Sequence, residues 1–343
     1  MNSKQLLTNS RMKAARSCSR FHHHQYVNGW RAVLGQEELD FGTLIHKALE
    51  AWWLAPWTAN RLAAALAALA AFAKEKETDA FTLARARAML VGYDARWRDS
   101  DLIAISVEAR FEVALVNPAT GAESKTWRLA GKIDVIAKDS SGRIWIVEHK
   151  TSSESLEPGG TYWRRLRMDS QVSTYFDGAA ALGHDAAGCL YDVLAKPAQR
   201  PLKATPLESR KYRKDGALYS AQRETDETVE EYEARVMEAI AADPEGHFVR
   251  IEVPRLESEL REARVDRWQQ AVRMREDERL ERAPRNPDAC MRGAKPCPFF
   301  DVCSGVATLE DNAAFERVSN VNPELRDELT GDSPSVGSSQ ASR

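Results

Sequence analysis

The stretch 129–152, reading LAGKIDVIAKDSSGRIWIVEHKTS, constrains the fold more than any other part of the chain. Two short apolar runs with β-branched residues, 132–137 and 143–147, flank a polar turn that contains a glycine. This pattern is typical of a β-hairpin. Charged side chains inside apolar strands are costly unless something pairs with them, so Asp134 in the first run and Glu148 after the second require partners.

Lys150 follows Glu148 by two residues and therefore lies on the same face of the predicted strand. If the strands pair across the turn, Asp134 and Glu148 converge at one end of the sheet. Two carboxylates beside an ammonium indicate a site for a divalent cation next to a phosphate. A surface salt bridge between Lys150 and one carboxylate explains the same residues, because such pairs are common on protein surfaces. This stretch alone leaves both interpretations open.

The spacing Gly131-x-x-Asp134, followed by Glu148-x-Lys150, resembles motifs II and III of the PD-(D/E)XK nucleases, in particular the RecB-like exonucleases. The resemblance covers roughly residues 10–305. It implies an α/β fold with a PD-(D/E)XK restriction-endonuclease-like core, in which helices flank a mixed central sheet. Helical elaborations and a C-terminal four-cysteine cluster region are expected around this core.

Two further boxes of that group occur in the same order along the chain. Gly42 and His46 match an upstream helical G-x-x-x-H box, and Gln171 and Tyr175 match a downstream Q-x-x-x-Y box. The resemblance implies that Gln171 and Tyr175 hydrogen-bond the strand, or brace the site from a neighbouring helix. Glu108, on a predicted strand, matches a glutamate often seen on the first strand of RecB-like folds.

The resemblance implies metal-dependent hydrolysis of phosphodiester bonds. Asp134 and Glu148 are expected to bind Mg²⁺ or Mn²⁺, with His46 and the backbone carbonyl of His149 completing the ligands. Hard oxygen ligands suit both ions, and an added imidazole suits Mn²⁺. Lys150 is expected to polarise the attacking water and to offset phosphate charge. The number of metal ions stays open.

An aromatic and basic segment follows the hairpin and is a candidate DNA contact. Arg164, Arg165 and Arg167 are expected to contact phosphates, and Trp163 to stack on a base. A merely solvated loop is the alternative. Because the formal net charge of the whole chain is only −3, any nucleic-acid surface must be a local patch.

Four of the five cysteines suggest a metal centre. Cys290, Cys297 and Cys303 lie close together in sequence, and Cys18 lies near the start. This arrangement resembles the iron–sulfur clasp of AddB-type nucleases and CRISPR-associated RecB-like exonucleases, although the spacing within the trio departs from the AddB pattern. The resemblance implies a structural 4Fe–4S cluster, with zinc or unligated thiols as alternatives. Cys189, in an apolar run, is interpreted as a core residue.

Local composition suggests how the chain is divided. An alanine- and leucine-rich stretch favours helix near residue 65, and a proline-, glycine- and serine-rich end favours disorder. The expected parts are an N-terminal segment with Cys18 and the His46 helix (1–58), a helical elaboration (59–100), the nuclease core (101–255), a long helix and cysteine region packing back on the N-terminus (256–320) and a disordered tail (321–343).

The preferred hypothesis is a DNA exonuclease acting in recombination, repair or phage replication. A structure-specific DNA endonuclease and a non-catalytic DNA-binding scaffold are the alternatives. No G-x-x-x-x-G-K-[ST] phosphate loop occurs, so the chain itself is not expected to be a helicase, and a helicase or recombination partner could supply unwinding. No long apolar run predicts a membrane span, and a cytoplasmic location is expected. The run His22 to His24 is expected to be a solvated segment near the DNA.

Overall fold

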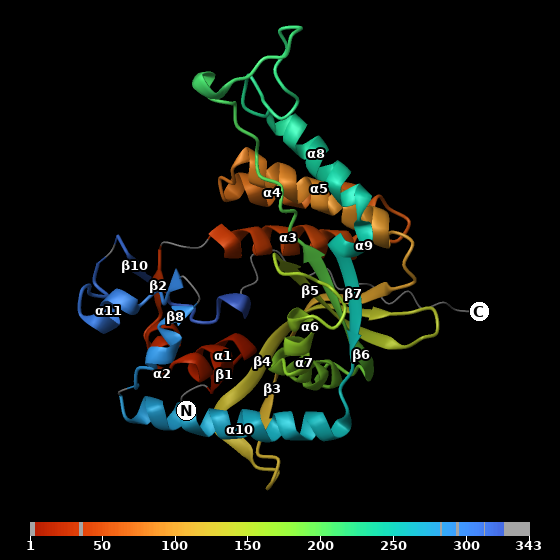
Figure 1. Ribbon diagram of the computed structural model, residues 1–343. Helices are drawn as coiled ribbons and strands as arrows, with labels where there is room; N and C mark the ends of the chain where they lie inside the picture. Colours follow the sequence, from red (N-terminus) through yellow and green to blue (C-terminus); the bar gives the residue numbers. More distant parts are fainter. Residues whose placement is uncertain (1–3, 34–36, 282, 293–294, 312, 326–343) are drawn as a thin grey trace.

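A mixed sheet forms the centre of the computed structural model, which describes residues 4–33, 37–281, 283–292, 295–311 and 313–325 (Figure 1). Its strands are β1 (Gln5–Leu7), β3 (Ile103–Val116), β4 (Glu123–Lys138), β5 (Ile144–Ser152), β6 (Ala186–Ala195) and β7 (Phe248–Val253). The order is β1-β4-β5-β6-β7, and β3 also pairs with β4. The β5–β6 pair is parallel and the β4–β5 pair antiparallel, so the predicted mixed sheet is confirmed.

The predicted hairpin is confirmed as β4 and β5, with Val135 opposite Val147. Its turn is closed by Asp139, whose carboxylate accepts hydrogen bonds from the backbone N–H of Arg143 at 3.0 Å and the indole of Trp145 at 2.9 Å. A side chain that binds backbone donors in this way stabilises a turn locally. The turn therefore fixes the register in which the two strands carry their charged residues.

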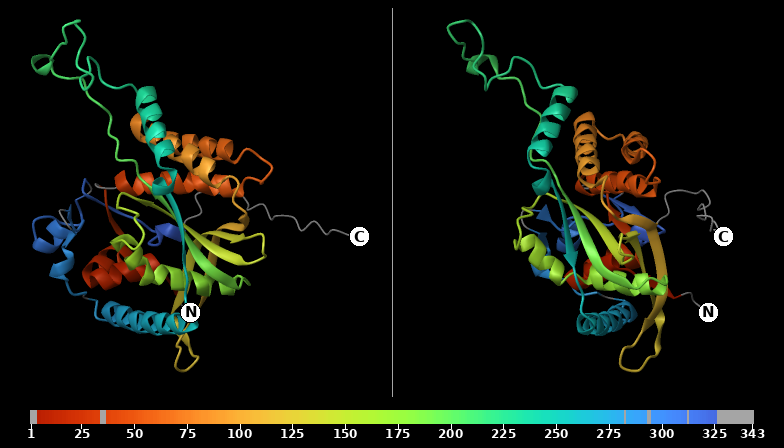
Figure 2. Two further views of the ribbon diagram at one scale, coloured as in Figure 1. Left: turned by 45° about the vertical axis from the view of Figure 1, so that its right-hand side comes forward. Right: turned by 90° about the vertical axis from the view of Figure 1, so that its right-hand side faces the viewer.

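One face of the sheet is covered by four helices (Figures 1 and 2). They are α3 (Glu37–Leu54), α4 (Arg61–Glu75), α5 (Ala80–Trp97) and α8 (Val229–Ala242). Trp52, Tyr93 and Ile240 bury their side chains in one apolar cluster with Val147 of β5. Of the region expected to be a helical elaboration, α5 meets the sheet, where the hydroxyl of Tyr93 donates to Asp192 of β6 at 2.7 Å, whereas α4 packs on α3. The helix α3 itself lies over the hairpin and carries His46.

The opposite face carries the helices α1 (Asn9–Ser17), α6 (Thr161–Arg167), α7 (Ser170–Ala181) and α10 (Glu257–Arg279). Gly131 of β4 and Gly178 of α7 both lie against the ring of Phe111, and a Cβ atom at either position would clash with that ring. Glycine is therefore required for the close approach of α7 to the sheet. The ring of Tyr175 in turn meets Phe111 edge-on, at 6.5 Å between centroids.

The two ends of the described chain pack together beside α1 (Figure 1). The elements there are α2 (Ser19–His22), the π-helix η1 (His23–Val27), β2 (Trp30–Ala32), η3 (Pro287–Ala289), β8 (Met291–Arg292), β9 (Lys295–Pro296), α11 (Phe300–Ser304), β10 (Phe315–Arg317) and η4 (Pro323–Leu325). β2 pairs with β10, and Phe299 packs on Phe21 and Phe315. Burial of Leu325 shows that the chain packs as far as that residue, while 326–343 lie outside the described residues.

The expectation of a solvated histidine segment is wrong. His22 and His24 are only 3% and 8% exposed, and the ring of His24 lies against Phe299. Arg11 donates a hydrogen bond to His22 at 3.2 Å. Burial lowers the pKa of His22 to about 3 and that of His24 to about 4, so both rings are neutral packing groups.

The remaining short elements are α9 (Pro244–His247), which leads into β7, and η2 (Leu207–Ser209), in the long connection between β6 and α8. Within the residues described, no helix has the length and apolar character needed to cross a membrane.

Candidate active site

The charged residues of the hairpin meet where β4 and β5 separate. β4 pairs with β5 as far as Val135 and with β1 at Trp127 to Leu129, and the ladder records no pair in between on that side of β4. In this gap the carboxylate of Asp134 accepts the backbone N–H of His149 at 2.8 Å. The side chain thus takes the place of a strand partner. We call this point, where β4 and β5 separate beside Asp134 and Glu148, the fork.

Glu148 is the most deeply buried carboxylate of the site, with a side chain only 1% exposed. Lys150 forms an ion pair with its Oε1 atom, and Gln171 donates a hydrogen bond to the same atom at 2.8 Å. Gln171 also donates to the hydroxyl of Tyr175 at 2.6 Å. Asp169 caps the helix by accepting the N–H of Gln171, which fixes where α7 begins. The two motif residues of α7 therefore brace Glu148.

His46 reaches the same place from α3. Its Nδ1 atom lies 3.6 Å from Oδ2 of Asp134. Burial lowers the pKa of His46 to about 4, although Asp134 acts in the opposite direction. The imidazole is therefore neutral at neutral pH, which is the form that binds metal ions.

The two carboxylates differ in their charge. Burial, aided by the nearby charge of Asp134, raises the pKa of Glu148 to about 8. Burial acts in the same direction on Asp134, but His46, His149 and Lys150 outweigh it and lower its pKa. For Lys150, burial is outweighed by Glu148 and Asp134, which raise the pKa of its ammonium. Without further positive charge, Asp134 stays ionised at neutral pH, whereas Glu148 takes up a proton near neutral pH.

The donors of this site fit a hard divalent cation. The Oε2 atom of Glu148 is buried and has no hydrogen-bond partner in the described structure, so it is an acceptor still to be satisfied. Two carboxylates and a neutral imidazole suit Mg²⁺ or Mn²⁺. The side chains are not arranged as a finished metal site, since the described residues contain no group of three His, Cys, Asp or Glu side chains in such an arrangement. The ammonium of Lys150 forms an ion pair with Glu148 and lies beside this carboxylate in place of a third ligand.

The ring of His149 points away from the carboxylates, into an aromatic pocket with Trp53 and Tyr93. There its Nδ1 atom lies 3.4 Å from Asp192, which accepts hydrogen bonds from Tyr93 and Arg250, each at 2.7 Å. Any part of His149 in metal binding thus falls to its backbone. Sequence reasoning missed this network, although a charged Asp192 inside the apolar run of β6 was a usable signal.

Glu108 lies beside the site on the edge strand β3. Its neighbours pair with the neighbours of Asp134, and it forms an ion pair with Lys132. Its φ of 53° is in the left-handed region, which is rare for a residue other than glycine and is found at functional sites. Burial and the charge of Asp134 raise the pKa of Glu108. A third carboxyl group therefore borders the fork.

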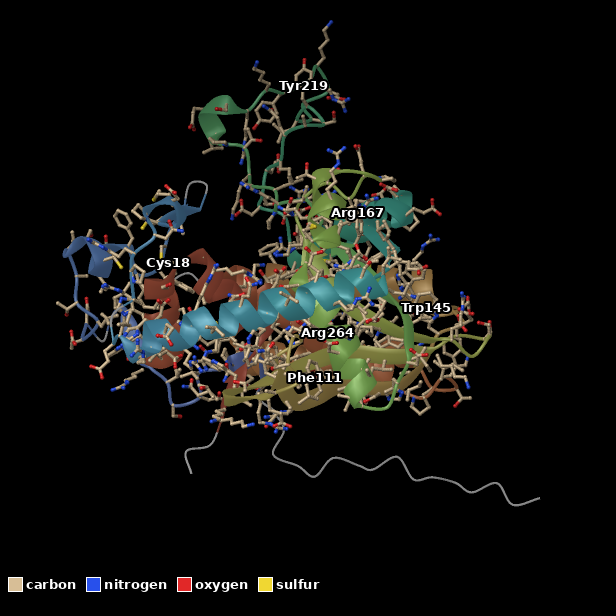
Figure 3. All side chains as sticks on the ribbon, turned by 90° about the horizontal axis from the view of Figure 1, so that it is seen from below. Cys18, Phe111, Trp145, Arg167, Tyr219 and Arg264 are labelled. Atoms are coloured by element: carbon tan, nitrogen blue, oxygen red, sulfur yellow. The ribbon has the colours of Figure 1, made fainter. Side chains whose placement is uncertain are left out.

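A groove of about 1040 Å³ opens from Lys150 between α1, α6 and α10. Of the predicted DNA contacts, Arg165 and Arg167 line it, and Figure 3 shows Arg167 at the surface. Arg164 is exposed but is not among the lining residues, and Arg165 is paired with Glu154 at 2.6 Å.

The prediction that Trp163 stacks on a base is wrong. Trp163 is only 8% exposed, because its ring packs in the core beneath α6 and its indole N–H donates to the carbonyl of Leu156 at 2.9 Å. Its neighbour Tyr162 lines the groove instead. Sequence reasoning also missed Lys13, Arg16 and Arg255, which enter the groove from distant parts of the chain.

Four cysteines line one small cavity at the packed chain ends, namely Cys18, Cys290, Cys297 and Cys303. The N–H of Asn286 lies 3.4 Å from the sulfur of Cys18. Burial raises the pKa of the Cys303 thiol, and the other three cysteines add to this against the opposing charge of Arg20. As at the fork, the described side chains include no finished metal-binding group. Cys189 lies elsewhere, fully buried in the core of the sheet.

Three comparisons with known proteins bear on the family of this chain. No curated protein matches the chain. Solved structures do match, among them the crystal structure of SSO0001, at 12% identity over 71% of this chain and 77% of that one, but its TM-score of 0.26 is too low to carry an argument. The family model of the PD-(D/E)XK nuclease superfamily matches residues 7–304. The chain therefore belongs to this superfamily, whose members are phosphodiester hydrolases that typically use Mg²⁺ or Mn²⁺.

Proposed function

We propose that this protein is a metal-dependent DNA exonuclease that trims DNA ends during recombination, repair or phage replication. Nuclease activity follows from the superfamily. The observation that carries the proposal is the meeting of Asp134, Glu148 and Lys150 at the fork of one hairpin, with His46 and Gln171 against them. The exonuclease assignment is supported by the RecB-like order of these motifs along the chain.

Asp134 and Glu148 would hold the metal ion, with His46 and the His149 carbonyl as further ligands. Once bound, Mg²⁺ or Mn²⁺ lowers the pKa of a water molecule and neutralises phosphate charge. Lys150 would orient the attacking water and offset negative charge on the phosphate.

The supporting residues act by position. The N–H of His149 holds the carboxylate of Asp134, and Gln171 holds Oε1 of Glu148. The hydroxyl of Tyr175 fixes the amide of Gln171. The carboxylate of Asp134 and Oε1 of Glu148 are therefore held in place before substrate arrives.

The groove beside Lys150 is the proposed path of the DNA strand. Lys13, Arg16, Arg167 and Arg255 line it and supply positive charge for the phosphates, as expected for backbone contacts. Tyr162 offers a ring on which a base can stack.

The four-cysteine cavity is proposed to hold a structural 4Fe–4S cluster, with zinc as the alternative occupant. Both accept four thiolates. Support comes from the convergence of Cys18 with three cysteines that lie more than 250 residues away in sequence. Metal–thiolate bonds would offset the entropy of joining distant chain segments.

A helicase or recombination partner is proposed to supply unwinding.

Cleavage assays test the proposal. Linear and circular DNA, single- and double-stranded, is incubated with Mg²⁺, Mn²⁺ or EDTA, using wild type and Lys150→Ala. Lys138→Ala, an exposed lysine of the same hairpin, is the matched control. Loss of linear DNA only, abolished by EDTA and by Lys150→Ala, is the expected result. Nicking of circles would instead establish an endonuclease, and binding without cleavage would establish a scaffold.

A further inference from the structure

The connection between β6 and α8, residues 196–228, extends away from the sheet as a projecting arm (Figures 1 and 2). Tyr219, near its tip, is labelled at the outer limit of the molecule in Figure 3. Nothing in the proposed chemistry of the fork uses this segment.

The neck of the projecting arm is held by hydrogen bonds. Thr205 donates its N–H to the carbonyl of Arg223 at 2.9 Å, joining the outgoing and returning chains. The guanidinium of Arg210 donates to the carbonyls of Thr205 and Glu224, at 2.9 and 2.8 Å. The bonds to Arg223 and Glu224 join the outgoing and returning segments, so the arm is preformed before any partner binds.

The tip is also fixed. The N–H of Arg213 donates to the carbonyl of Ala217 at 2.7 Å, and Tyr212 forms a bridge with Leu218. Gly216 permits the turn with a φ of 79°, which favours glycine. The backbone that carries Tyr212 therefore has a defined conformation.

The side chains of this tip are exposed, aromatic and basic. Tyr212 and Tyr219 are 54% and 53% exposed. Residues 207–222 contain four basic and two acidic residues, in a chain whose net charge is −3. Among the described residues, the ion pairs of the arm involve Lys203, Arg213, Arg223 and Glu227, and none involves Lys211 or Lys214.

The base of the arm adjoins the fork. Lys150 pairs with Val193 in the parallel β5–β6 ladder, and the N–H of Lys196 donates to the carbonyl of Ser152 at 2.7 Å. The arm thus starts at the end of the sheet that carries Lys150. In Figure 3, Tyr219 projects on the same side of the molecule as Arg167, which lines the groove.

We propose that the projecting arm binds single-stranded DNA outside the active site, and this proposal rests on the proposed nuclease function. Tyr212 and Tyr219 stack on unpaired bases, while Lys211 and Lys214 contact phosphates. Exposed rings combined with ammonium groups are how proteins bind single strands without sequence preference. The arm would keep a long strand associated while its end lies at the fork.

Binding is measured in EDTA with polythymidine strands of about 40 and about 6 nucleotides, one longer than typical single-strand binding sites and one near their lower limit. The variants are Lys211→Ala/Lys214→Ala and Tyr212→Leu/Tyr219→Leu. The control is Lys125→Ala/Lys138→Ala, which removes two exposed lysines of β4. We expect each arm variant to bind the long strand about fivefold more weakly or worse. The preference for long over short strands should fall, and the control should retain it.

Two further readings identify the contacts. Loss of two phosphate contacts should reduce the slope of log affinity against log salt by about 1.4. Tyr212→Phe/Tyr219→Phe should restore binding, because the phenyl ring keeps the stacking face. Unchanged melting temperatures in all variants show that the effects arise at the surface.

Wild-type length preference in the arm variants would overturn the proposal, as would an effect confined to duplex DNA. Equal weakening on both lengths would also overturn it, since the arm would then not act at a distance. Cleavage distinguishes the two proposals. If wild type cuts DNA but the arm variants keep full length preference, only the arm assignment fails. If wild type cuts nothing yet binding depends on the arm, only the nuclease assignment fails.

Discussion

The fork and the four-cysteine cavity are both proposed metal sites, but they are built differently. At the fork, Asp134 and Glu148 stand on long strands at the centre of the sheet. Around the cavity, β8, β9 and α11 have only two, two and five residues. Long paired strands position side chains without a ligand, whereas such short elements depend on their few contacts. The comparison suggests that metal at the fork serves chemistry, and metal in the cavity serves the fold.

The largest effect is expected at the fork. Lys150→Ala removes the ammonium beside Glu148 and should lower the cleavage rate by about 10²- to 10³-fold, the scale seen when a charge-stabilising group is lost. The melting temperature should stay close to that of wild type, since the Lys150 side chain is about one-third exposed. Lys138→Ala should cut at the wild-type rate. A Lys150→Ala protein that cuts normally would remove this side chain from the proposed chemistry.

The next effect concerns the cavity. Cys297→Ser/Cys303→Ser should lose bound iron or zinc, measured by elemental analysis, and should lower the melting temperature by several degrees. Cys189→Ala is the control, because that residue is buried outside the cavity and its loss should leave the metal content intact. Full metal content in the double variant would contradict the cluster, and full stability without metal would contradict its structural role.

A smaller effect is expected on the pH dependence of stability. The pKa of Glu148 is about 8 in the folded protein and 4.5 as its ordinary value, so between these pH values the folded state binds more protons. The unfolding free energy of the metal-free protein should therefore fall as pH rises through this window. In EDTA, melting temperatures of Glu148→Gln should fall less steeply than those of wild type. Exposed Glu154→Gln should keep the wild-type slope, and a slope equal in all three proteins would disprove the assignment.

The smallest effect is expected from Tyr175→Phe, which removes the hydroxyl bonded to Gln171 and keeps the ring against Phe111. Loss of one hydrogen bond predicts about a fivefold slower reaction, with little change in stability. Tyr232→Phe, which removes a hydroxyl bonded to the carbonyl of Gln199, is the control and should cut normally. A loss as large as that of Lys150→Ala would instead mean that the Tyr175 hydroxyl takes part in the chemistry.

The hairpin was predictable, because apolar runs with β-branched residues around a polar turn are local features of the sequence. The place of Gln171 beside the hairpin was expected from the family resemblance. The meeting of Glu148 and Lys150 was predictable locally, since residues two apart on a strand share a face. What failed depended on packing. The burial of Trp163 is set by a core that no local pattern reveals, and His24 is buried against Phe299 of the C-terminal segment.

The groove could not be predicted for a related reason. Lys13, Arg16 and Arg255 are ordinary surface cations in sequence, and only the tertiary fold brings them to Lys150. The network around Asp192 was partly readable, because a carboxylate inside an apolar strand signals a partner. Its partner, Arg250, comes from β7 and could not be named from spacing.

The long helix α10 has a consequence for how this protein can be shortened. Arg264 and Arg267 of α10 both bind the carboxylate of Asp177 on α7, at 2.7 and 2.6 Å, and Met274 is buried in the core that also holds Tyr175. A fragment ending before residue 256 would keep the fork residues yet leave α7 without its outer support. The minimal active unit therefore extends well past the last motif, and mapping by deletion would misplace the site at the C-terminus.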